Sequence, residues 1–415
     1  MVKAEVAIIG GGVSGLAAAA ALQANEVDWL LLEASDAPGG RMRTDDLDGT
    51  LVDRGFQVLN TAYAALHRSV DMELLGLQSF QLGARIMSAG RMSAFYDPQR
   101  LPGRALTSLG SSPANLGDYT ALARLSLANA GSEPASLDLP ALEVLPTLGF
   151  SERFIADFLQ PFFSAVFLDK TLDIPWRNMR EMVLLFSQGL ASLPAEGMQA
   201  LPRLMARPLD PQRIHCNCPV EEIGKGILRL AGGASVDCQL AIMATDAATA
   251  ARLTGLAGLP RMNGIRSFHF AVPSPPTADP IIYLPGGAEQ GPVCSMAIPS
   301  NVQLGYAFGN RAQLIANSLI MDGGMDELQG PLRNQLLSWF GGQVDDWELL
   351  ASYDIPDALP VPSAMGSIPA NDQLLRERGL LLCGDYPGTP SINRAVASGR
   401  SAGNLAAMHM KISHG

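Results

Sequence analysis

The run Glu5-Val6-Ala7-Ile8-Ile9-Gly10-Gly11-Gly12-Val13-Ser14-Gly15-Leu16-Ala17 decides the fold of this 415-residue chain. An apolar segment typical of a strand ends at a glycine cluster, and an alanine-rich segment typical of a helix follows it, from Val13 to Ala24. Gly10 permits a sharp turn, Gly12 lets the backbone approach a pyrophosphate, and Gly15 lets the helix lie close to the strand. The N–H groups at the start of the helix, at Val13 and Ser14, then face negative charge. The stretch therefore predicts a dinucleotide site.

A carboxylate follows at the spacing that such a site requires. Leu30-Leu31-Leu32 predicts a second buried strand, and Glu33 and Ala34 follow it. Glu33 lies 33 − 15 = 18 residues after the third glycine, near the roughly 20 expected for a carboxylate that accepts hydrogen bonds from a ribose. A secretory signal is the competing interpretation of the apolar N-terminus. We reject it because three consecutive glycines interrupt the apolar run.

Composition excludes several classes of function. The formal net charge is −11, which argues against a nucleic-acid surface. The five cysteines are an odd number on a long chain, which favours reduced thiols in a cytoplasmic protein. The run His215-Cys216-Asn217-Cys218 has no second ligand pair at zinc spacing, so we expect no metal site. No apolar run reaches the length of a membrane span, although peripheral contact with a membrane stays open.

The loop after Glu33 carries a second signature. Gly39 and Gly40 would let the chain fold back across a dinucleotide, and Arg41 beside them can bind pyrophosphate oxygens. The glycine turn, Glu33 and Gly39-Gly40-Arg41-x-x-Thr44 together resemble the FAD-binding signature of the flavin amine oxidase superfamily. This superfamily includes protoporphyrinogen oxidases and carotenoid desaturases such as phytoene desaturase, and segments at 157–169 and 193–202 are most similar to protoporphyrinogen-oxidase-like members.

The resemblance implies further cofactor contacts. The segment 48–58 resembles a strand and glycine turn that run beneath the flavin, so the backbone of Gly55, Phe56, Gln57 and Val58 should face the isoalloxazine ring. Val220 matches the position of a valine whose backbone meets the adenine, and Ala244 matches a strand end near the same ring. A buried strand edge explains these last two matches equally well.

The C-terminal segment resembles the superfamily's second flavin motif. An apolar strand, Leu380 to Cys383, ends in Gly384-Asp385, and a helix with small residues on one face is predicted from Ser391 to Gly403. A strand-end carboxylate such as Asp385 can bind ribityl hydroxyls. The helix start, with Ser391, Ile392 and Ala395, can stabilise negative charge on the flavin pyrimidine. The expected cofactor is FAD, held without a covalent bond, since Cys383 lies in an apolar strand where thiols are usually inert.

These elements predict an α/β fold in which a Rossmann-like FAD-binding domain carries an inserted α+β substrate domain. The cofactor domain is expected at 1–71, 208–260 and 361–415, and the substrate domain at 72–207 and 261–360. Helices are predicted at 119–130, 151–159, 180–190 and 328–340. Strands are predicted at 213–218, 227–230, 235–240, 240–245, 267–272 and 281–284.

The resemblance implies an enzyme in which FAD accepts a hydride from a small organic substrate, with no side-chain catalyst required. Many amine-oxidising members hold a water at the flavin with a lysine, but this chain has no lysine between Lys225 and Lys411. A lipophilic or cyclic substrate is therefore favoured over an amine. Flavin amine oxidation, a non-catalytic lipid- or partner-binding protein like the Rab GDP-dissociation inhibitors, and an NAD-dependent dehydrogenase remain as alternatives. The catalytic side chains, the oligomeric state and the electron acceptor stay open.

Two groups of residues have both a structural and a functional interpretation. Phenylalanines at 154, 158, 162, 163 and 167 fit a helical core better than a substrate tunnel wall. The polar residues His269, Gln57, Tyr386 and Arg394 could approach the flavin ring, but most such groups only satisfy hydrogen bonds in a core.

Overall fold

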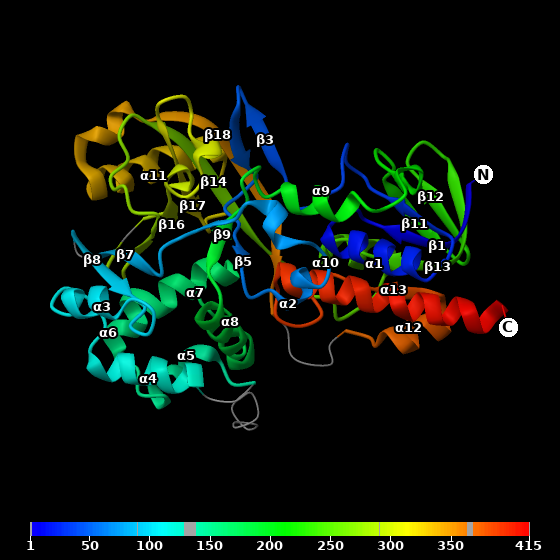
Figure 1. Ribbon diagram of the computed structural model, residues 1–415, viewed down its shortest axis with the longest axis horizontal. Helices are drawn as coiled ribbons and strands as arrows, with labels where there is room; N and C mark the ends of the chain where they lie inside the picture. Colours follow the sequence, from blue (N-terminus) through cyan, green and yellow to red (C-terminus); the bar gives the residue numbers. More distant parts are fainter. Residues whose placement is uncertain (1, 89, 128–137, 290, 363–367, 415) are drawn as a thin grey trace.

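The computed structural model describes residues 2–88, 90–127, 138–289, 291–362 and 368–414 of the chain. Figure 1 shows two bodies side by side, one around each of two large sheets, with both chain ends on the same body. This architecture confirms the predicted fold class. Among the described residues, no helix is long and apolar enough to cross a membrane.

The first sheet joins strands from both ends of the chain. The strands β10, β2, β1 and β13 follow one another in this order, and neighbours among them are parallel. The strand β19 pairs in parallel with the end of β13. The strand β12 pairs antiparallel with the start of β13, and β11 pairs antiparallel with β12. These strands are β1 (Val2–Ile9), β2 (Trp29–Leu32), β10 (Ile214–His215), β11 (Val220–Gly224), β12 (Ile227–Leu230), β13 (Ser235–Met243) and β19 (Leu380–Leu382). Because β1 and β19 share β13 as a neighbour, the N-terminal and C-terminal motifs end at the same edge of one sheet.

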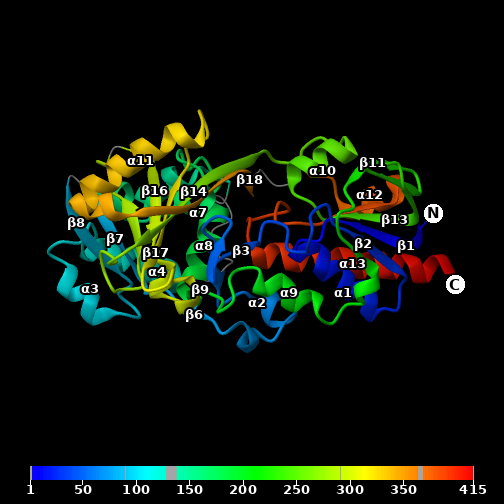
Figure 2. The ribbon, with the colours of Figure 1, turned by 90° about the horizontal axis from the view of Figure 1, so that it is seen from above.

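Two helices lie side by side against this sheet, as Figures 1 and 2 both show: α1 (Val13–Ala24) and α13 (Ile392–His414). Small residues allow the close approach. A Cβ on Gly399 would overlap the carbonyl oxygen of Ser14, and one on Gly403 would come within 2.6 Å of the Ala18 carbonyl oxygen. The alanine-rich sequence of α1 is therefore explained by a partner helix that packs almost backbone to backbone.

The second sheet has the strand order β18, β14, β17, β16, β15, β7 and β8. On β14, Phe268, Phe270 and Val272 face one core, while Ser267 and His269 point to the opposite face. The strands are β7 (Gly83–Ser88), β8 (Arg91–Tyr96), β14 (Met262–Val272), β15 (Ile282–Pro285), β16 (Val293–Ala297), β17 (Ala312–Ser318) and β18 (Glu348–Pro360); α11 (Met325–Phe340) packs on it. The strands predicted at 267–272 and 281–284 and the helix predicted at 328–340 are confirmed.

Small sheets and turns connect the two bodies. The hairpin of β3 (Thr44–Leu47) and β4 (Thr50–Asp53) turns at Asp48-Gly49, where both residues have positive φ, as a two-residue type I′ turn requires. The strand β9 (Ala191–Leu193) pairs with β5 (Leu59–Asn60) and with β6 (Gln78–Ser79). The segment that follows β4 is thereby tied to the helical layer.

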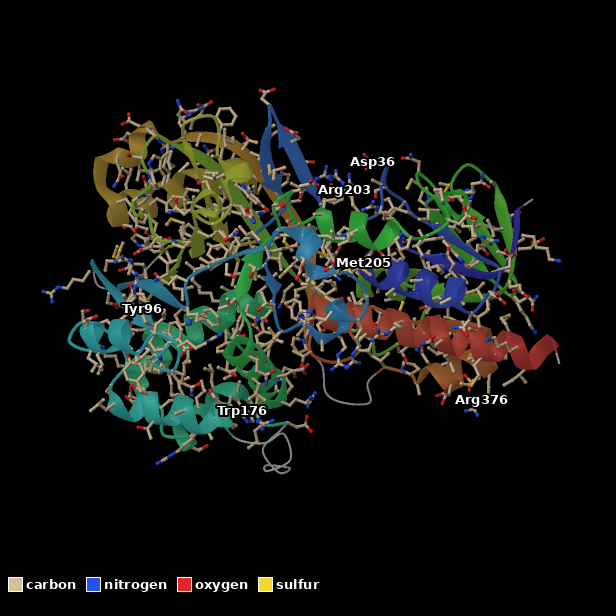
Figure 3. All side chains as sticks on the ribbon, viewed as in Figure 1. Asp36, Tyr96, Trp176, Arg203, Met205 and Arg376 are labelled. Carbon is tan, nitrogen blue, oxygen red and sulfur yellow. The ribbon has the colours of Figure 1, made fainter. Side chains whose placement is uncertain are left out.

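The helical layer lies below the second sheet in Figure 1, where side chains fill the space between helices, as Figure 3 shows around the labelled Trp176. Its helices are α3 (Pro102–Ser108), α4 (Leu116–Leu127), α5 (Ala141–Thr147), α6 (Glu152–Phe154), α7 (Gln160–Phe167) and α8 (Trp176–Gln188). The predicted helices at 119–130, 151–159 and 180–190 all lie in this layer. The last residues of the first fall outside the described residues, and the second continues as a π-helical turn, Ile155–Leu159.

The remaining helices are α2 (Ala64–His67), α9 (Ala200–Ala206), α10 (Ala247–Thr254) and α12 (Asn371–Arg378). Two strand predictions need correction. The predicted strand 213–218 is only β10, because Asn217 takes a positive φ and its N–H binds the Ser35 carbonyl oxygen instead of a strand partner. The two strands predicted at 235–240 and 240–245 are one continuous strand, β13, since no residue between them breaks the pairing with β1.

Candidate functional site

The glycine turn between β1 and α1 has the geometry that a phosphate requires. Gly10 has φ +105°, and a Cβ there would lie 2.9 Å from the Ala244 carbonyl oxygen, while a Cβ on Gly15 would overlap the Gly10 carbonyl oxygen. At Gly12, by contrast, a Cβ would meet only the Gly40 Cα, at 3.9 Å. The start of α1 has no side-chain cap. The turn therefore presents open space in front of the uncapped start of the helix, at Val13 and Ser14.

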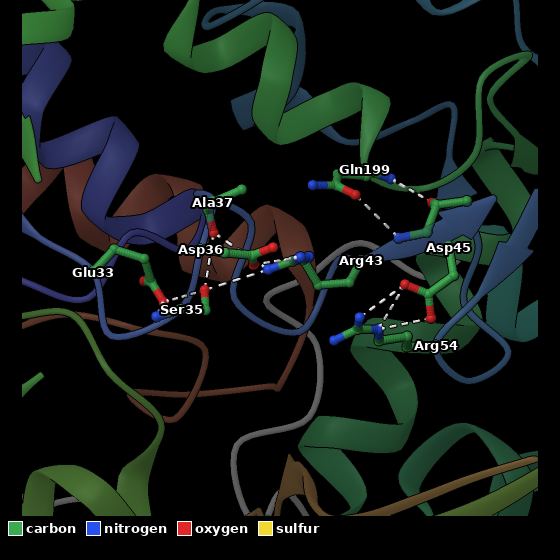
Figure 4. Close-up of polar contacts among 9 residues, drawn as sticks. Glu33, Ser35, Asp36, Ala37, Arg43, Asp45, Arg54 and Gln199 are labelled. Carbon is green, nitrogen blue, oxygen red and sulfur yellow. Dashed lines mark hydrogen bonds and ion pairs between the residues drawn. The ribbon is translucent and has the colours of Figure 1, made fainter. Parts of the chain in front are cut away.

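Glu33 is buried at the end of β2, next to the glycine turn. Its carboxylate accepts hydrogen bonds from the Gly11 N–H at 2.6 Å, the Ser35 N–H at 2.8 Å and the Ser35 hydroxyl at 2.6 Å. Figure 4 shows Glu33 beside Ser35, with Arg43 bound to Asp36 across the same loop. Because a carboxylate can accept about four hydrogen bonds, Glu33 keeps capacity for a further donor such as a ribose hydroxyl. Ala34 follows it on the exposed surface.

The two residues predicted near an adenine lie on either side of this turn. The Ala244 N–H binds the Ile9 carbonyl oxygen at 2.8 Å, which fixes Ala244 beside Gly10. The Cys218 N–H binds the Glu33 carbonyl oxygen at 2.8 Å, two residues before Val220 at the start of β11. The structure thus brings Val220, Ala244 and Glu33 together around the carboxyl ends of β1 and β2.

Arg41 and Asp385 form an ion pair between the two ends of the chain. The Arg41 Nη2 lies 2.8 Å from the Asp385 Oδ1, and its Nη1 donates to the Ala358 carbonyl oxygen on β18 at 2.8 Å. Burial lowers the pKa of the Arg41 guanidinium, but the surrounding carboxylates, Asp385 above all, outweigh burial and raise it overall. Since three of the five guanidinium N–H groups have no partner in these two contacts, Arg41 can still bind an anion. Gly40, with φ +58°, lies against Gly12.

The loop from β19 to α13 is held from within. The Ser398 hydroxyl donates to the Gly384 carbonyl oxygen at 2.6 Å and accepts from the Gly384 N–H at 2.9 Å. Ser391 caps α13, because its hydroxyl accepts the Arg394 N–H at 3.1 Å. Ile392 begins the helix, and Ala395 is buried against the core. These hydrogen bonds hold Asp385 and the start of α13 within one loop.

The segment Gly55 to Val58 lies between the glycine turn and the second sheet. Gly55 has φ +88°, and a Cβ there would come 2.7 Å from the Ile355 side chain on β18. The Gln57 side chain donates to the Arg41 carbonyl oxygen at 2.7 Å. The Phe56 ring makes an edge contact with Phe80, with ring centroids 5.8 Å apart, and Val58 packs on the core.

An apolar cavity of about 180 Å³ opens beside this segment. Phe80, which contacts Phe56, lines it together with Phe95, Phe158, Phe162, Phe163 and Phe186. Phe154 and Phe167 are fully buried in the core instead and do not line it. The phenylalanine-rich region, for which a core was the preferred interpretation, therefore divides between core and cavity wall.

The polar candidates for ring contact have different surroundings. His269 is fully buried, at 1% exposed. Burial lowers its pKa to about 4, and a hydrogen bond with the Gln313 side chain opposes this shift. Burial also raises the pKa of Tyr386 well above its usual value, and its hydroxyl has no partner in the described part of the chain. Burial raises the pKa of the Cys383 thiol to about 12, which leaves it a poor nucleophile.

These features fit two parts of a dinucleotide. The uncapped start of α1, the open space at Gly12 and the spare donors of Arg41 fit its pyrophosphate. The remaining acceptor capacity of Glu33 fits its ribose. Asp385 and the start of α13 lie at the same edge of the sheet and fit the other half of such a cofactor. Among the described residues, no cluster of three metal-ligating side chains occurs. The fold and the geometry of this site thus define the class of α/β proteins that bind a dinucleotide.

Comparison with known proteins gives the family. The model of the family described as flavin containing amine oxidoreductase matches residues 13–405, and the chain belongs to this family. The prediction of an FAD-dependent oxidoreductase of the flavin amine oxidase superfamily is confirmed at the level of the family.

Solved structures share the fold at low sequence identity. A protein of Exiguobacterium sp. 255-15 named provisionally as a protoporphyrinogen oxidase is 16% identical, covers 98% of this chain and 99% of that one, and has a TM-score of 0.73. A putrescine oxidase bound to putrescine is 17% identical over 99% of both chains, with a TM-score of 0.71.

A rice protein, Polyamine oxidase 5 of Oryza sativa subsp. japonica, is 36% identical over 93 residues, which is 22% of this chain and only 18% of that protein.

Some contacts at the site had no local signal in the sequence. Ala358 binds Arg41 through its backbone, and Asn178 and Glu181 on α8 bind Thr389 in the loop before α13. These partners come from the ranges predicted for a substrate domain and lie more than 200 positions from the residues that they bind. No spacing rule connects such positions.

Proposed function

We propose that this chain oxidises a lipophilic or cyclic organic substrate by removing a hydride from it. Bound FAD would supply the hydride acceptor. The observation that carries the proposal is the apolar cavity beside Phe56. Its phenylalanine walls offer an apolar surface to a substrate next to the segment predicted to face the flavin.

The residues that we propose for FAD are those predicted from the sequence. Their arrangement around one sheet edge and one loop supports this assignment. They are Gly10, Gly12, Val13, Ser14, Gly15, Glu33, Ala34, Gly40, Arg41, Gly55, Phe56, Gln57, Val58, Val220, Ala244, Gly384, Asp385, Ser391, Ile392 and Ala395. The division into a cofactor domain at 1–71, 208–260 and 361–415 and a substrate domain in the ranges between is part of the same proposal. So is a cytoplasmic location, supported by five unpaired cysteines.

Amine oxidation is the second candidate, favoured by the likeness to proteins named as polyamine and putrescine oxidases. The cavity argues against it. Among the described residues that line it, Asp97 alone carries a carboxylate, and this carboxylate binds Arg100 at 2.9 Å. A polyammonium substrate in an apolar cavity would need unpaired carboxylates to offset the loss of its hydration.

Anaerobic mixing with candidate substrates decides between these functions. A lipophilic cyclic compound, a porphyrinogen, putrescine and a monoamine are each added to the flavin-loaded protein without oxygen, and flavin absorbance near its long-wavelength maximum is followed. Bleaching by the lipophilic or cyclic compounds supports the proposal. Bleaching by putrescine or the monoamine alone contradicts it and selects amine oxidation.

A further inference from the structure

A polar cluster links the helical layer to the loop before α13. The Thr389 hydroxyl donates to the Glu181 Oε2 at 2.5 Å, and the Asn178 Nδ2 donates to the Thr389 Oγ1 at 3.0 Å. Asn178 and Thr389 are almost fully buried, at 2% and 3% exposed. The cluster therefore fixes the carboxylate of Glu181 against the loop that carries Asp385.

Arg394 completes the cluster from the first turn of α13. Its Nη2 lies 3.7 Å from the Glu181 Oε1. Its guanidinium lies over Gly388, since a Cβ there would be 3.0 Å from the Arg394 Nε. A negative and a positive side chain thus stand together beside the start of the helix that is proposed to face the flavin.

The same helix, α8, also reaches the cavity. Val183, Phe186 and Ser187 line the cavity, whereas Asn178 and Glu181 contact the loop. With about 100° of rotation per residue, Val183 lies on the order of 140° around the helix from Asn178. One face of α8 therefore lines the cavity, and another face contacts the loop before α13.

We propose that Glu181 and Arg394 are positioning residues that set the electrostatic potential at the start of α13 and thereby tune the reduction potential of the bound flavin. This inference rests on the proposed cofactor site. Reduction places negative charge on the flavin, which a nearby cation stabilises and a nearby anion destabilises. Arg394 should raise the potential, and Glu181 should lower it by opposing Arg394.

One buried acceptor of the cluster has no partner in the described part of the chain. The Oδ1 of Asn178 has no hydrogen-bond partner among the described residues although the side chain is buried. A buried acceptor that stays unpaired costs about 1–3 kcal/mol.

The test is the reduction potential of the bound flavin, measured by titration against a reference dye in four proteins: wild type, Arg394→Gln, Glu181→Gln and the double variant. The potential should fall in Arg394→Gln, rise in Glu181→Gln and lie between these values in the double variant. Both side chains are 39–49% exposed, so the shifts should shrink as salt is added.

A matched control is Glu222→Gln, which removes the carboxylate of an exposed ion pair with Arg229 on the β11–β12 hairpin. Its potential should equal that of the wild type. Unchanged potentials in both single variants, or shifts of the same sign, would overturn the inference, because a general disturbance of the loop has no reason to give opposite signs. Failure of every variant and of the wild type to bind FAD would instead overturn the proposed site itself.

Discussion

Arg41 and Asp385 lie 344 positions apart in the chain, yet their side chains meet at 2.8 Å. The Arg41 side chain is one-third exposed and that of Asp385 is almost buried. From the resemblance, each was predicted to bind a different part of FAD. Their contact shows that the two ends of the chain meet in the fold, and each side chain helps to hold the other in place.

Replacement of Asp385 by alanine should weaken FAD binding. The variant removes a charged hydrogen-bond acceptor and the partner of Arg41, with an expected loss of about 1.5–3 kcal/mol. This corresponds to a rise in the dissociation constant of roughly 10- to 150-fold. Titration with FAD, followed by quenching of flavin fluorescence, measures it. An unchanged constant would show that Asp385 does not contact the cofactor.

Replacement of Gly12 by valine should abolish FAD retention while leaving the fold intact. A Cβ at this position meets only the Gly40 Cα, at 3.9 Å, so the protein itself has room for part of the side chain. The valine side chain would fill the space that we propose for the pyrophosphate. Bound FAD and melting temperature are measured together, with Gly110→Val as control, since a Cβ on Gly110 meets nothing within 4 Å. Normal FAD content in Gly12→Val would refute the assignment of the turn.

Replacement of Gly399 by alanine should destabilise the fold, because the new Cβ would overlap the Ser14 carbonyl oxygen and push α13 away from α1. Overpacking of this kind costs about 1–3 kcal/mol. Chemical unfolding of Gly399→Ala is compared with that of Gly103→Ala, a helical glycine with nothing within 4 Å. Equal stability of the two variants would mean that the helices do not pack this closely.

Two neighbouring phenylalanines should respond differently to truncation. Phe154→Ala removes a ring that is fully buried in the core and should cost about 3–5 kcal/mol of stability. Phe162→Ala removes a partly exposed ring from the cavity wall and should raise KM for an apolar substrate with little change in FAD content. Unfolding curves and steady-state kinetics of both variants check this. A KM effect from Phe154 alone would place the substrate elsewhere.

The stability of the protein should fall as pH drops from 6.5 towards 4. Burial lowers the pKa of His269 from 6.5 to about 4, so in this range the unfolded chain binds a proton that the folded chain does not, and unfolding is favoured. At about 1.4 kcal/mol per pH unit, the loss is on the order of 3 kcal/mol. His269→Phe should flatten the pH dependence of the unfolding midpoint. An identical slope in wild type and His269→Phe would contradict this origin.

The sequence predicted the fold where its signals were local. The glycine turn, the alanine-rich helix and the Gly384-Asp385 motif each depend on residues within a few positions of one another, and the structure places them as a dinucleotide fold requires. The strand predicted at 213–218 failed because the positive φ of Asn217 follows from a bond to Ser35, nearly two hundred positions away.

The candidate site was predicted only in part for the same reason. Phe154 and Phe162 share one helical spacing, so the pattern could not separate core from cavity wall. The contact of Arg41 with Asp385 and those of Asn178 and Glu181 with Thr389 join residues that only the tertiary fold brings together. The spacing of the apolar residues also did not predict the π-helical turn at Ile155–Leu159.

The stoichiometry of FAD in the purified protein tests the central idea most directly, that both ends of the chain enclose one flavin. After incubation with excess FAD and removal of the unbound fraction, the protein is denatured and the released nucleotide is identified and counted. We expect close to one FAD per chain, all of it released without covalent attachment. A protein that stays colourless after this treatment, or that releases NAD instead, would contradict the account.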